Sequence, residues 1–152
     1  LLAALVEIHR TSGAAGEKKV VFSDATHRPV SLLGNEGRLV QVFQNLLMNA
    51  LSFSPPAGSV AVRASVDSRF LVVTVDDDGP GIPDSSLVRI FNRFYSERPE
   101  GEQFGTHSGL GLSISRQIVE AHDGEIRAEN RRDGSGRVLG ARFVVCLPLA
   151  AA

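Results

Sequence analysis

The sequence predicts an α+β fold: a two-layer sandwich in which a mixed β-sheet carries helices packed on one face. Three observations indicate this fold. Runs with β-strand character occur in pairs, amphipathic helices separate the pairs, and strict alternation of single strands with helices is absent. With 152 residues, 43% of them hydrophobic and 22% charged, the chain has the size and composition of one folded domain.

The first part of the chain predicts a helical fragment, a linker and a strand pair. Residues 1–10 are apolar but lack the basic start and the cleavage site of a signal peptide, so they resemble the end of a longer helix. Residues 11–16, TSGAAG, have linker composition. Strands are expected over 18–23 and 28–33, and Pro29 suggests an edge or a strand start.

The strongest helix signal spans residues 38–53, preceded by Asn35 as a possible N-cap. Its apolar residues recur at helical spacing. Gln41, Asn45 and Asn49 are four residues apart and so share one face. This face is either an ordinary solvated surface or a row of amides directed at a ligand, and the helix alone favours neither. The apolar stripe consists of Leu39, Val42, Phe43, Leu46, Leu47, Ala50 and Phe53.

The rest of the chain predicts two further strand pairs, two helices and a long loop. Residues 92–108 are rich in charge and glycine, and a loop of this length in a compact domain is generally functional. The remaining elements are expected as strands over 59–66 and 70–75, a short helix over 85–91, a helix over 109–122, and a closing hairpin of strands 125–129 and 138–147.

Composition excludes several classes of function. The net charge is −1, so the basic field typical of nucleic-acid binders is absent. The single cysteine, Cys146, excludes an internal disulfide and a cysteine zinc site, and its apolar neighbours predict a small buried side chain. No apolar run reaches the roughly 18 residues of a membrane span. We therefore expect no nucleic-acid partner and no direct membrane contact for this domain.

Two glycine-rich segments are candidate ligand sites. Residues 77–83, DDGPGIP, directly follow an apolar strand, where glycines allow close backbone approach and carboxylates accept hydrogen bonds; an ordinary turn would have a similar composition. Residues 105–112, GTHSGLGL, open a helix, and a glycine-rich helix N-terminus suits phosphate. The spacing matches neither the Walker motif nor the Rossmann fingerprint.

Together with two other segments, these sites resemble an ordered set of four motifs. QVFQNLLMNA resembles the asparagine box of sensor histidine kinases, DDGPGIP their first glycine box, IFNRFYS their phenylalanine box, and GTHSGLGLSISRQIVEAHDGEI their second glycine box. The resemblance implies the catalytic, ATP-binding domain of a two-component histidine kinase, with the fold of gyrase B and MutL ATPases. Residues 17–150 would form this domain, and residues 1–16 would be the tail of a dimerisation hairpin and its linker.

The resemblance also implies a role for each motif residue. Asn49 would coordinate Mg²⁺ that bridges the ATP phosphates, and Asn45 would lie near the phosphates with a catalytic role. Asp77 would accept the adenine amino group in a pocket shaped by Gly79, Gly81 and Ile82. The segment 92–108 would be the ATP lid. The remaining ATP contacts would come from Tyr95, and more weakly Arg93, and from Ser108, Gly109, Leu110, Gly111 and Leu112 at the triphosphate.

The chain departs from the family pattern at two positions on the central helix. Ser52 replaces a Lys that can reach a terminal phosphate in many members, with Arg93 and Arg98 as possible substitutes. Asn45 stands where gyrase-like hydrolases have a Glu that activates water. An amide lacks basic character, which favours transfer of the phosphate to another acceptor over hydrolysis.

The phosphate acceptor itself is not found. None of His9, His27, His107 and His122 fits the family's phosphoacceptor, which precedes an acidic residue on a helical hairpin. The resemblance thus implies that the γ-phosphate passes to a histidine on a dimerising hairpin outside this chain, and then to a response regulator aspartate. It also implies a cytoplasmic domain of an inner-membrane receptor kinase. The alternatives are a nucleotide-binding regulatory module without kinase activity, and a gyrase-like ATPase or anti-sigma serine kinase.

Overall fold

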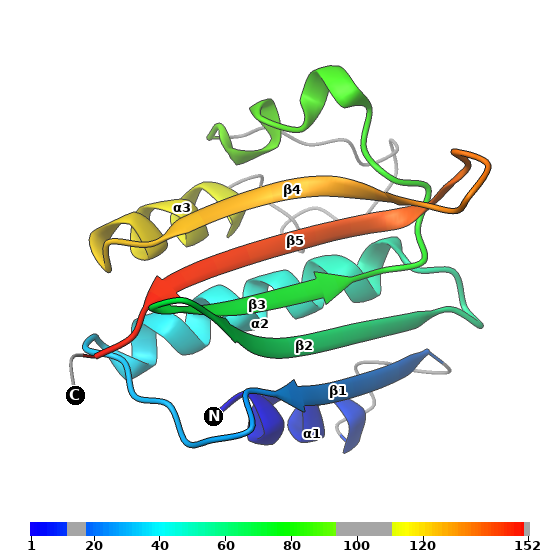
Figure 1. Ribbon diagram of the computed structural model, residues 1–152. Helices are drawn as coiled ribbons and strands as arrows, with labels where there is room; N and C mark the ends of the chain where they lie inside the picture. The colour runs from blue at the N-terminus through cyan, green and yellow to red at the C-terminus, as the bar shows by residue number, and fades with distance from the viewer. Residues whose placement is uncertain (12–17, 94–110, 151–152) are drawn as a thin grey trace.

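A five-stranded sheet forms one layer of the structure (Figure 1). The computed structural model describes residues 1–11, 18–93 and 111–150. In space the strands follow the order β1-β2-β3-β5-β4. Their bounds are Lys19–Ala25 for β1, Ser59–Asp67 for β2, Phe70–Asp76 for β3, Glu125–Arg132 for β4 and Val138–Pro148 for β5.

The second layer consists of three helices that lie on the same face of the sheet (Figure 1). They are α1 (Leu2–Thr11), α2 (Glu36–Phe53) and α3 (Gly111–Ala121). β1 and β2 pair in parallel, and α2 supplies the long connection that parallel neighbours require. The other pairs are antiparallel, so the sheet is mixed. The predicted α+β, two-layer architecture is confirmed.

The hydrophobic core lies between α2 and the strands β2, β3 and β5. The apolar stripe predicted for α2 is buried except for Phe53, which is only half-buried, and Val42 and Leu46 are fully enclosed. Phe91, beyond β3, packs edge-to-face on Phe143 of β5 with ring centroids 6.1 Å apart. Burying a side chain of this size stabilises the fold by about 1.5–3 kcal/mol. The facing sheet residues include Val60, Val62, Val73, Val75, Val145 and Leu147.

The start of α2 rests on the end of α3. Asn35 is the N-cap, as predicted, because its side chain accepts a hydrogen bond from the Arg38 N–H at 3.0 Å. Its own N–H donates to His122 Nε2 at 3.0 Å, while His122 Nδ1 lies 2.7 Å from the Ile118 carbonyl. A Cβ on Gly34 would lie 2.6 Å from His122 Nε2, so only glycine fits there. The sequence did not predict this role for His122.

The strand predicted over residues 28–33 is wrong. β1 pairs with β2 instead, and the segment after β1 is irregular. Pro29 has no N–H to donate to a ladder. Val30 and Leu32 pack against the core, and the Ser31 carbonyl accepts a bond from the Ala150 N–H at 2.8 Å. The alternating apolar pattern thus serves packing without a partner strand.

The predicted short helix over residues 85–91 consists of two 3₁₀ turns. These are η1 (Asp84–Ser86) and η2 (Arg89–Phe91). Pro83 precedes the first, and no side chain caps either of them. The two turns bury Ser86, Ile90 and Phe91, which attaches the segment to the core side of the sheet.

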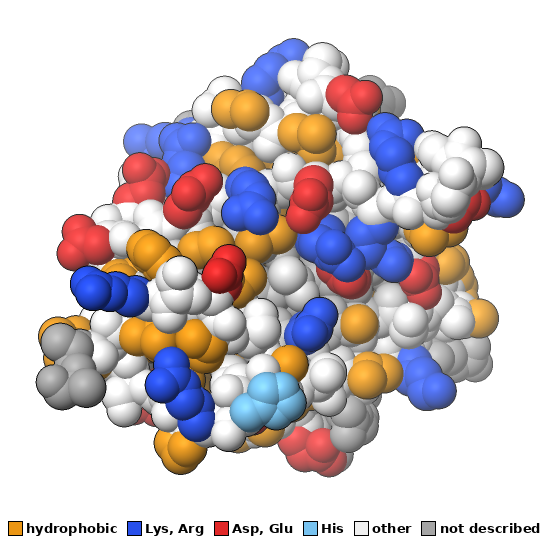
Figure 2. All heavy atoms as spheres, viewed as in Figure 1, with side chains coloured by type: hydrophobic (Ala, Val, Ile, Leu, Met, Phe, Trp, Pro, Cys, Tyr) orange, Lys and Arg blue, Asp and Glu red, His pale blue; other side chains and the backbone are white. Residues whose placement is uncertain are grey.

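The face of the sheet opposite the helices is open. Figure 2 shows basic and acidic side chains interspersed on this face among small apolar areas. No helix in the described ranges is long and apolar enough to cross a membrane.

The central position of α2 generates a stability prediction. Replacing Leu46 by Ala should lower the free energy of unfolding by about 3 kcal/mol, because it removes a fully enclosed side chain and leaves a cavity. Urea unfolding monitored by circular dichroism measures the change. Gln44→Ala, at an exposed position of the same helix, should stay within about 0.5 kcal/mol of the parent chain. Equal effects of the two substitutions would contradict the assigned core.

Candidate functional site

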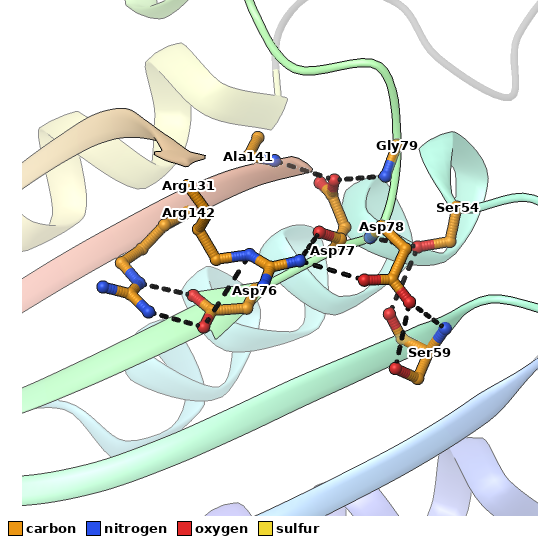
Figure 3. Close-up of polar contacts among 9 residues, drawn as sticks. All are labelled: Ser54, Ser59, Asp76, Asp77, Asp78, Gly79, Arg131, Ala141 and Arg142. Atoms are coloured by element: carbon orange, nitrogen blue, oxygen red, sulfur yellow. Dashed lines mark hydrogen bonds and ion pairs between the residues drawn. The ribbon is translucent and has the colours of Figure 1, made fainter. Parts of the chain in front are cut away.

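Three consecutive carboxylates begin at the last residue of β3: Asp76, Asp77 and Asp78 (Figure 3). The first of them, Asp76, forms an ion pair within the sheet. Asp76 lies opposite Arg142 of β5 in the sheet register. Arg142 donates to both carboxylate oxygens, at 2.7 Å from Nε and 2.9 Å from Nη2. The hydrogen bond to Asp76 raises the pKa of the Arg142 guanidinium. Arg131 Nε approaches the same carboxylate at 4.0 Å, so Asp76 has both oxygens occupied.

Asp78, the third carboxylate, is also fully paired. Its Oδ2 accepts from the Ser59 N–H at 2.8 Å and from Ser59 Oγ at 3.1 Å. Its Oδ1 accepts from Arg131 Nη2 at 2.9 Å, and its own N–H donates to Ser54 Oγ at 3.2 Å. Burial alone would raise the pKa of Asp78, but the hydrogen bonds from Ser59 and Arg131 outweigh it and lower the pKa overall.

Asp77, between them, is different because it keeps one oxygen available. Its side chain is only 2% exposed, and Oδ1 accepts from the Gly79 N–H at 2.9 Å and the Ala141 N–H at 3.1 Å (Figure 3). No hydrogen bond from the described residues reaches Oδ2. Burial raises the pKa of Asp77, and the two N–H bonds only partly oppose this. A buried carboxylate with one unpaired oxygen is suited to accept a hydrogen bond from a ligand N–H.

Two glycines, Gly79 and Gly140, allow the backbone to pack closely around Asp77. A Cβ on Gly79 would lie 2.8 Å from the Phe53 carbonyl oxygen, at the end of α2. A Cβ on Gly140 of β5 would collide with the carbonyl oxygen of Asp77 itself. Arg131 Nη2 donates to that carbonyl from the neighbouring strand. Both glycines are therefore required by close approach of backbone to backbone.

The far side of the same glycine-rich loop contacts β4. Gly81 has a φ of +83°, in the left-handed region, and a Cβ there would lie 2.8 Å from Asn130 Oδ1. Ile82 both donates to and accepts from the Asn130 side chain, at 2.7 Å each. Sequence reasoning missed Asn130, Arg131 and Gly140, since nothing in their local spacing connects them to a loop some 50 residues earlier.

The two asparagines of α2, Asn45 and Asn49, have different surroundings. Asn45 Nδ2 lies 3.3 Å from the Gly111 carbonyl and 3.3 Å from Ser115 Oγ, so it links α2 to the start of α3. Asn49, one turn later, is half-buried on the same face. The next position on this face is Phe53, which contacts the Gly79 backbone.

This face of α2 spans the distance between the two glycine-rich segments. Asn45 touches Gly111 at one end, and Phe53 touches Gly79 at the other. Eight residues of helix separate these contacts, about 12 Å at 1.5 Å per residue. Asn49 lies halfway. An extended nucleoside triphosphate has a comparable length, so the arrangement can present one site to a base and the other to phosphates.

At the second glycine segment the structure describes only Gly111 and Leu112, in the first turn of α3. That turn contains no acidic residue, so no carboxylate within it offsets the positive end of the helix dipole. Tyr95, Ser108, Gly109 and Leu110, like residues 94–108 of the predicted lid, lie outside the described residues.

The end of α2, beside Ser52, is contacted by a basic side chain that the sequence did not suggest. Lys18 Nζ donates to the carbonyl of Leu51, in the last turn of α2. That turn has no basic residue of its own, so Lys18 complements the helix dipole. Of the two arginines considered as substitutes for the missing Lys, Arg93 is exposed, and Arg98 lies outside the described ranges.

The residues present favour one kind of metal site. Among the residues that the structure describes, no group of three or more His, Cys, Asp or Glu side chains could hold a metal ion. Mg²⁺ commonly binds one or two protein oxygens together with substrate phosphates and water, so the single amide of Asn49 fits such an ion.

A cavity of about 420 Å³ lies elsewhere, between α1, β1 and the start of α2. Its lining is largely apolar and includes Phe22, Leu39, Phe43 and Leu71. None of the predicted ATP-site residues borders it. The carboxylate, glycine and amide contacts described above, rather than this cavity, define the candidate site.

Comparison with known proteins gives consistent results. Residues 34–151 match the family described as histidine kinase-, DNA gyrase B- and HSP90-like ATPases. The sensor protein ChvG of Rhizobium meliloti is 47% identical over 97% of this chain, which spans 27% of ChvG. The mycobacterial sensor histidine kinase MprB superposes with a TM-score of 0.80 at 26% identity, covering 99% of this chain and 96% of that one.

A second solved structure bears on the ligand. Full-length ShkA, in complex with AMPPNP, matches 99% of this chain with a TM-score of 0.78 at 27% identity, and 30% of the ShkA chain is covered. AMPPNP is an analogue of ATP. Together with the family match, these similarities show that the chain belongs to the family of histidine kinase-, DNA gyrase B- and HSP90-like ATPases and corresponds to the ATP-binding catalytic domain of the histidine kinases.

Proposed function

We propose that the chain binds ATP along the amide face of α2, with the adenine base at Asp77 and the phosphates near the start of α3. The observation that carries this proposal is the unpaired Oδ2 of the buried Asp77, since the exocyclic amine of adenine is a donor that would satisfy it. Gly79, Gly81 and Ile82 would form the wall of the base pocket. The polar contact of Asn45 with Gly111 supports a nearby phosphate site.

Asn49 would hold Mg²⁺ through its amide oxygen, with the phosphates supplying further ligands. When bound, Mg²⁺ neutralises phosphate charge and orients the terminal phosphate. Gly111 and Leu112 would present N–H groups to the triphosphate, together with Ser108, Gly109 and Leu110, and Tyr95 would contact the nucleotide from the lid. Lys18, which donates to the α2 carbonyl at Leu51, is already engaged and does not replace the Lys absent at Ser52.

The whole protein would be a histidine kinase that passes the γ-phosphate to a histidine on a dimerising helical hairpin. Asn45 supports transfer rather than hydrolysis, because its amide donates to Gly111 and Ser115 and cannot act as a base toward water. His122 is excluded as the acceptor because both ring nitrogens have partners. Residues 1–16 would belong to the hairpin and linker and residues 17–150 to the ATP-binding domain, in the cytoplasm beneath an inner-membrane receptor. A response regulator aspartate would be the final acceptor.

One experiment separates this function from a nucleotide-sensing module and from a hydrolase. A longer form of the protein that includes the hairpin is incubated with Mg²⁺ and ATP labelled at the γ-phosphate. An acid-labile, base-stable phosphoprotein is the expected result. Nucleotide binding without label would favour the regulatory module, and sustained phosphate release by the 152-residue chain alone would favour a gyrase-like ATPase.

Replacing Asn49 by Ala should reduce Mg²⁺-dependent ATP affinity by roughly tenfold or more, because a metal-held amide oxygen is lost. Folding should survive, since Asn49 is only half-buried. Isothermal titration with ATP, with and without Mg²⁺, measures the affinity, and circular dichroism checks the fold. Gln44→Ala serves as the control on the same helix. An unchanged Mg²⁺ dependence in the Asn49 variant would refute the metal role.

Replacing Asp77 by Asn should weaken ATP binding by about tenfold or more while leaving inorganic triphosphate binding nearly unchanged. The amide keeps an oxygen for the Gly79 and Ala141 N–H groups but directs its NH₂ at the adenine amine. Competition titrations with ATP and triphosphate measure the two affinities. Equal losses for both would argue against adenine recognition by Asp77.

The same variant should be more stable than the parent chain at neutral pH in the absence of nucleotide. Burial raises the folded-state pKa of Asp77. The protonated side chain therefore contributes to stability, and this contribution is fully present below the unfolded pKa of about 3.9 and is lost as the pH rises through the folded pKa. The stability gain of Asp77→Asn should therefore shrink as the pH falls toward 4. Urea unfolding at pH 7 and pH 4.5 tests this trend, and a gain that grows on acidification would contradict it.

A further inference from the structure

The side chain of Asn130 holds the first glycine-rich loop from outside the known motifs. Asn130 Oδ1 accepts from the Ile82 N–H, and Asn130 Nδ2 donates to the Ile82 carbonyl, each at 2.7 Å. Nδ2 also lies 3.4 Å from Asp84 Oδ1, at the start of η1. In Figure 1 the chain that leaves β3 passes the ends of β5 and β4, which brings this loop to β4, the strand that contains Asn130. A single side chain thus fixes both polar groups of one loop residue.

The two hydrogen bonds between Asn130 and Ile82 resemble those between neighbouring strands of a β-sheet. β4 is an outer strand of the sheet, so beyond β5 it has no strand partner among the described residues. A side-chain amide presents one acceptor and one donor, as a peptide group does. Ile82 is therefore held as a strand partner would be, without the chain having to form a strand in a loop that contains Gly81 and Pro83.

The two ends of the loop are anchored at one point of the β4–β5 pair. Asn130 lies opposite Ala141 in the register, and the Ala141 N–H is one of the two donors to Asp77 Oδ1. The next residue of β4, Arg131, donates to the Asp77 carbonyl. Asp77 and Ile82 are thus positioned by adjacent residues of the same two strands.

The loop is also pressed closely onto Asn130. A Cβ at Gly81 would lie 2.8 Å from Asn130 Oδ1 and 2.6 Å from Val138 Cγ1, and Gly81 adopts a positive φ. The loop can neither approach β4 more closely nor, while the two bonds to Ile82 persist, move away. This fixes the distance between the loop backbone and the Asp77 carboxylate.

We propose that Asn130 is a positioning residue for adenine recognition: it holds the Gly79–Ile82 segment where that segment presses the base against Asp77 Oδ2. The proposal rests on the proposed function of the Asp77 site. It assigns to β4 a role in nucleotide selectivity that the four sequence motifs do not contain. A merely structural Asn130 would affect stability but not the choice of base.

The test compares ADP with the 5′-diphosphate of purine riboside, an analogue that carries a hydrogen atom in place of the exocyclic amine and has no N–H on its six-membered ring. Only ADP can donate to Asp77, so the ratio of the two affinities reports on base positioning. Asn130→Ala should narrow this ratio by about tenfold, corresponding to the two lost hydrogen bonds. Arg127→Ala, an exposed position on the same strand, should leave it unchanged. Titration calorimetry at pH 8 measures both affinities, and thermal unfolding measures stability.

A second variant keeps the test decisive if Asn130→Ala fails to fold. Asn130→Asp retains the acceptor for the Ile82 N–H but turns the donor into an acceptor that faces the Ile82 carbonyl and Asp84. These oxygens should raise the pKa of the new carboxyl, and Arg132, 3.5 Å from Asp84, opposes this only partly. At pH 8 the ratio of the two nucleotide affinities should therefore be smaller in Asn130→Asp than in the parent chain. Near pH 5.5 the protonated carboxyl can donate again, and the ratio should return toward that of the parent chain at the same pH.

The outcomes separate this inference from the function on which it rests. If the parent chain binds no ADP, the proposed function itself fails. If the parent chain prefers ADP but the Asn130 variants keep that preference, with or without a change in melting temperature, Asn130 has only a structural role and the inference is overturned. A narrowed ratio in both variants, with recovery of Asn130→Asp at low pH, supports it.

Discussion

The candidate site depends on a carboxylate that the fold buries without pairing both of its oxygens. Taking Asp77 out of water is unfavourable unless hydrogen bonds replace its hydration. Two backbone N–H groups, from Gly79 and Ala141, meet one oxygen, and Arg131 meets the residue's carbonyl. The remaining oxygen has no donor among the described residues. A ligand N–H would supply one, so nucleotide binding and relief of this local penalty would be the same event.

Backbone contacts make this arrangement possible. Gly79 lets the loop lie against the end of α2, and Gly140 lets β5 pass directly beside Asp77. The neighbouring carboxylates are both paired with other side chains: Asp76 binds Arg142, and Asp78 binds Ser59 and Arg131. Because these two are fully engaged, Asp77 is distinguished from its neighbours by contacts and not by residue type.

α2 connects the core to the site. One face of the helix buries Val42 and Leu46 against the sheet, while another carries Asn45, Asn49 and Phe53 between the two glycine-rich segments. The helix is fixed at its start by the Asn35–His122 contact and at its end by Lys18. The spacing between base and phosphate positions is thus set by a rigid element, which suits a domain whose catalytic contribution is positioning and charge neutralisation.

Much of this fold could be predicted from the sequence because its signals are local. The 3.6-residue period identified α2, and alternation identified β2. The strand predicted over residues 28–33 is wrong, because Val30 and Leu32 pack on the core without a strand partner. Resemblance pointed to Asp77, whereas composition alone could not separate it from Asp78.

The parts that the sequence did not predict depend on long-range contacts. Asn130 meets a loop 48 residues earlier, and His122 meets Asn35 across 87 residues. No spacing rule connects such pairs, since strand register and helix packing bring them together only in the folded chain. The residues that support the motifs, such as Asn130 and His122, could therefore be identified only from the structure.

The most direct test of the account is a crystal structure of the chain with Mg²⁺ and a non-hydrolysable ATP analogue. The exocyclic amine of adenine should lie within hydrogen-bond distance of Asp77 Oδ2, and the amide oxygen of Asn49 should bind the metal. A well-ordered nucleotide whose base lies away from Asp77, leaving Oδ2 without a donor, would contradict it.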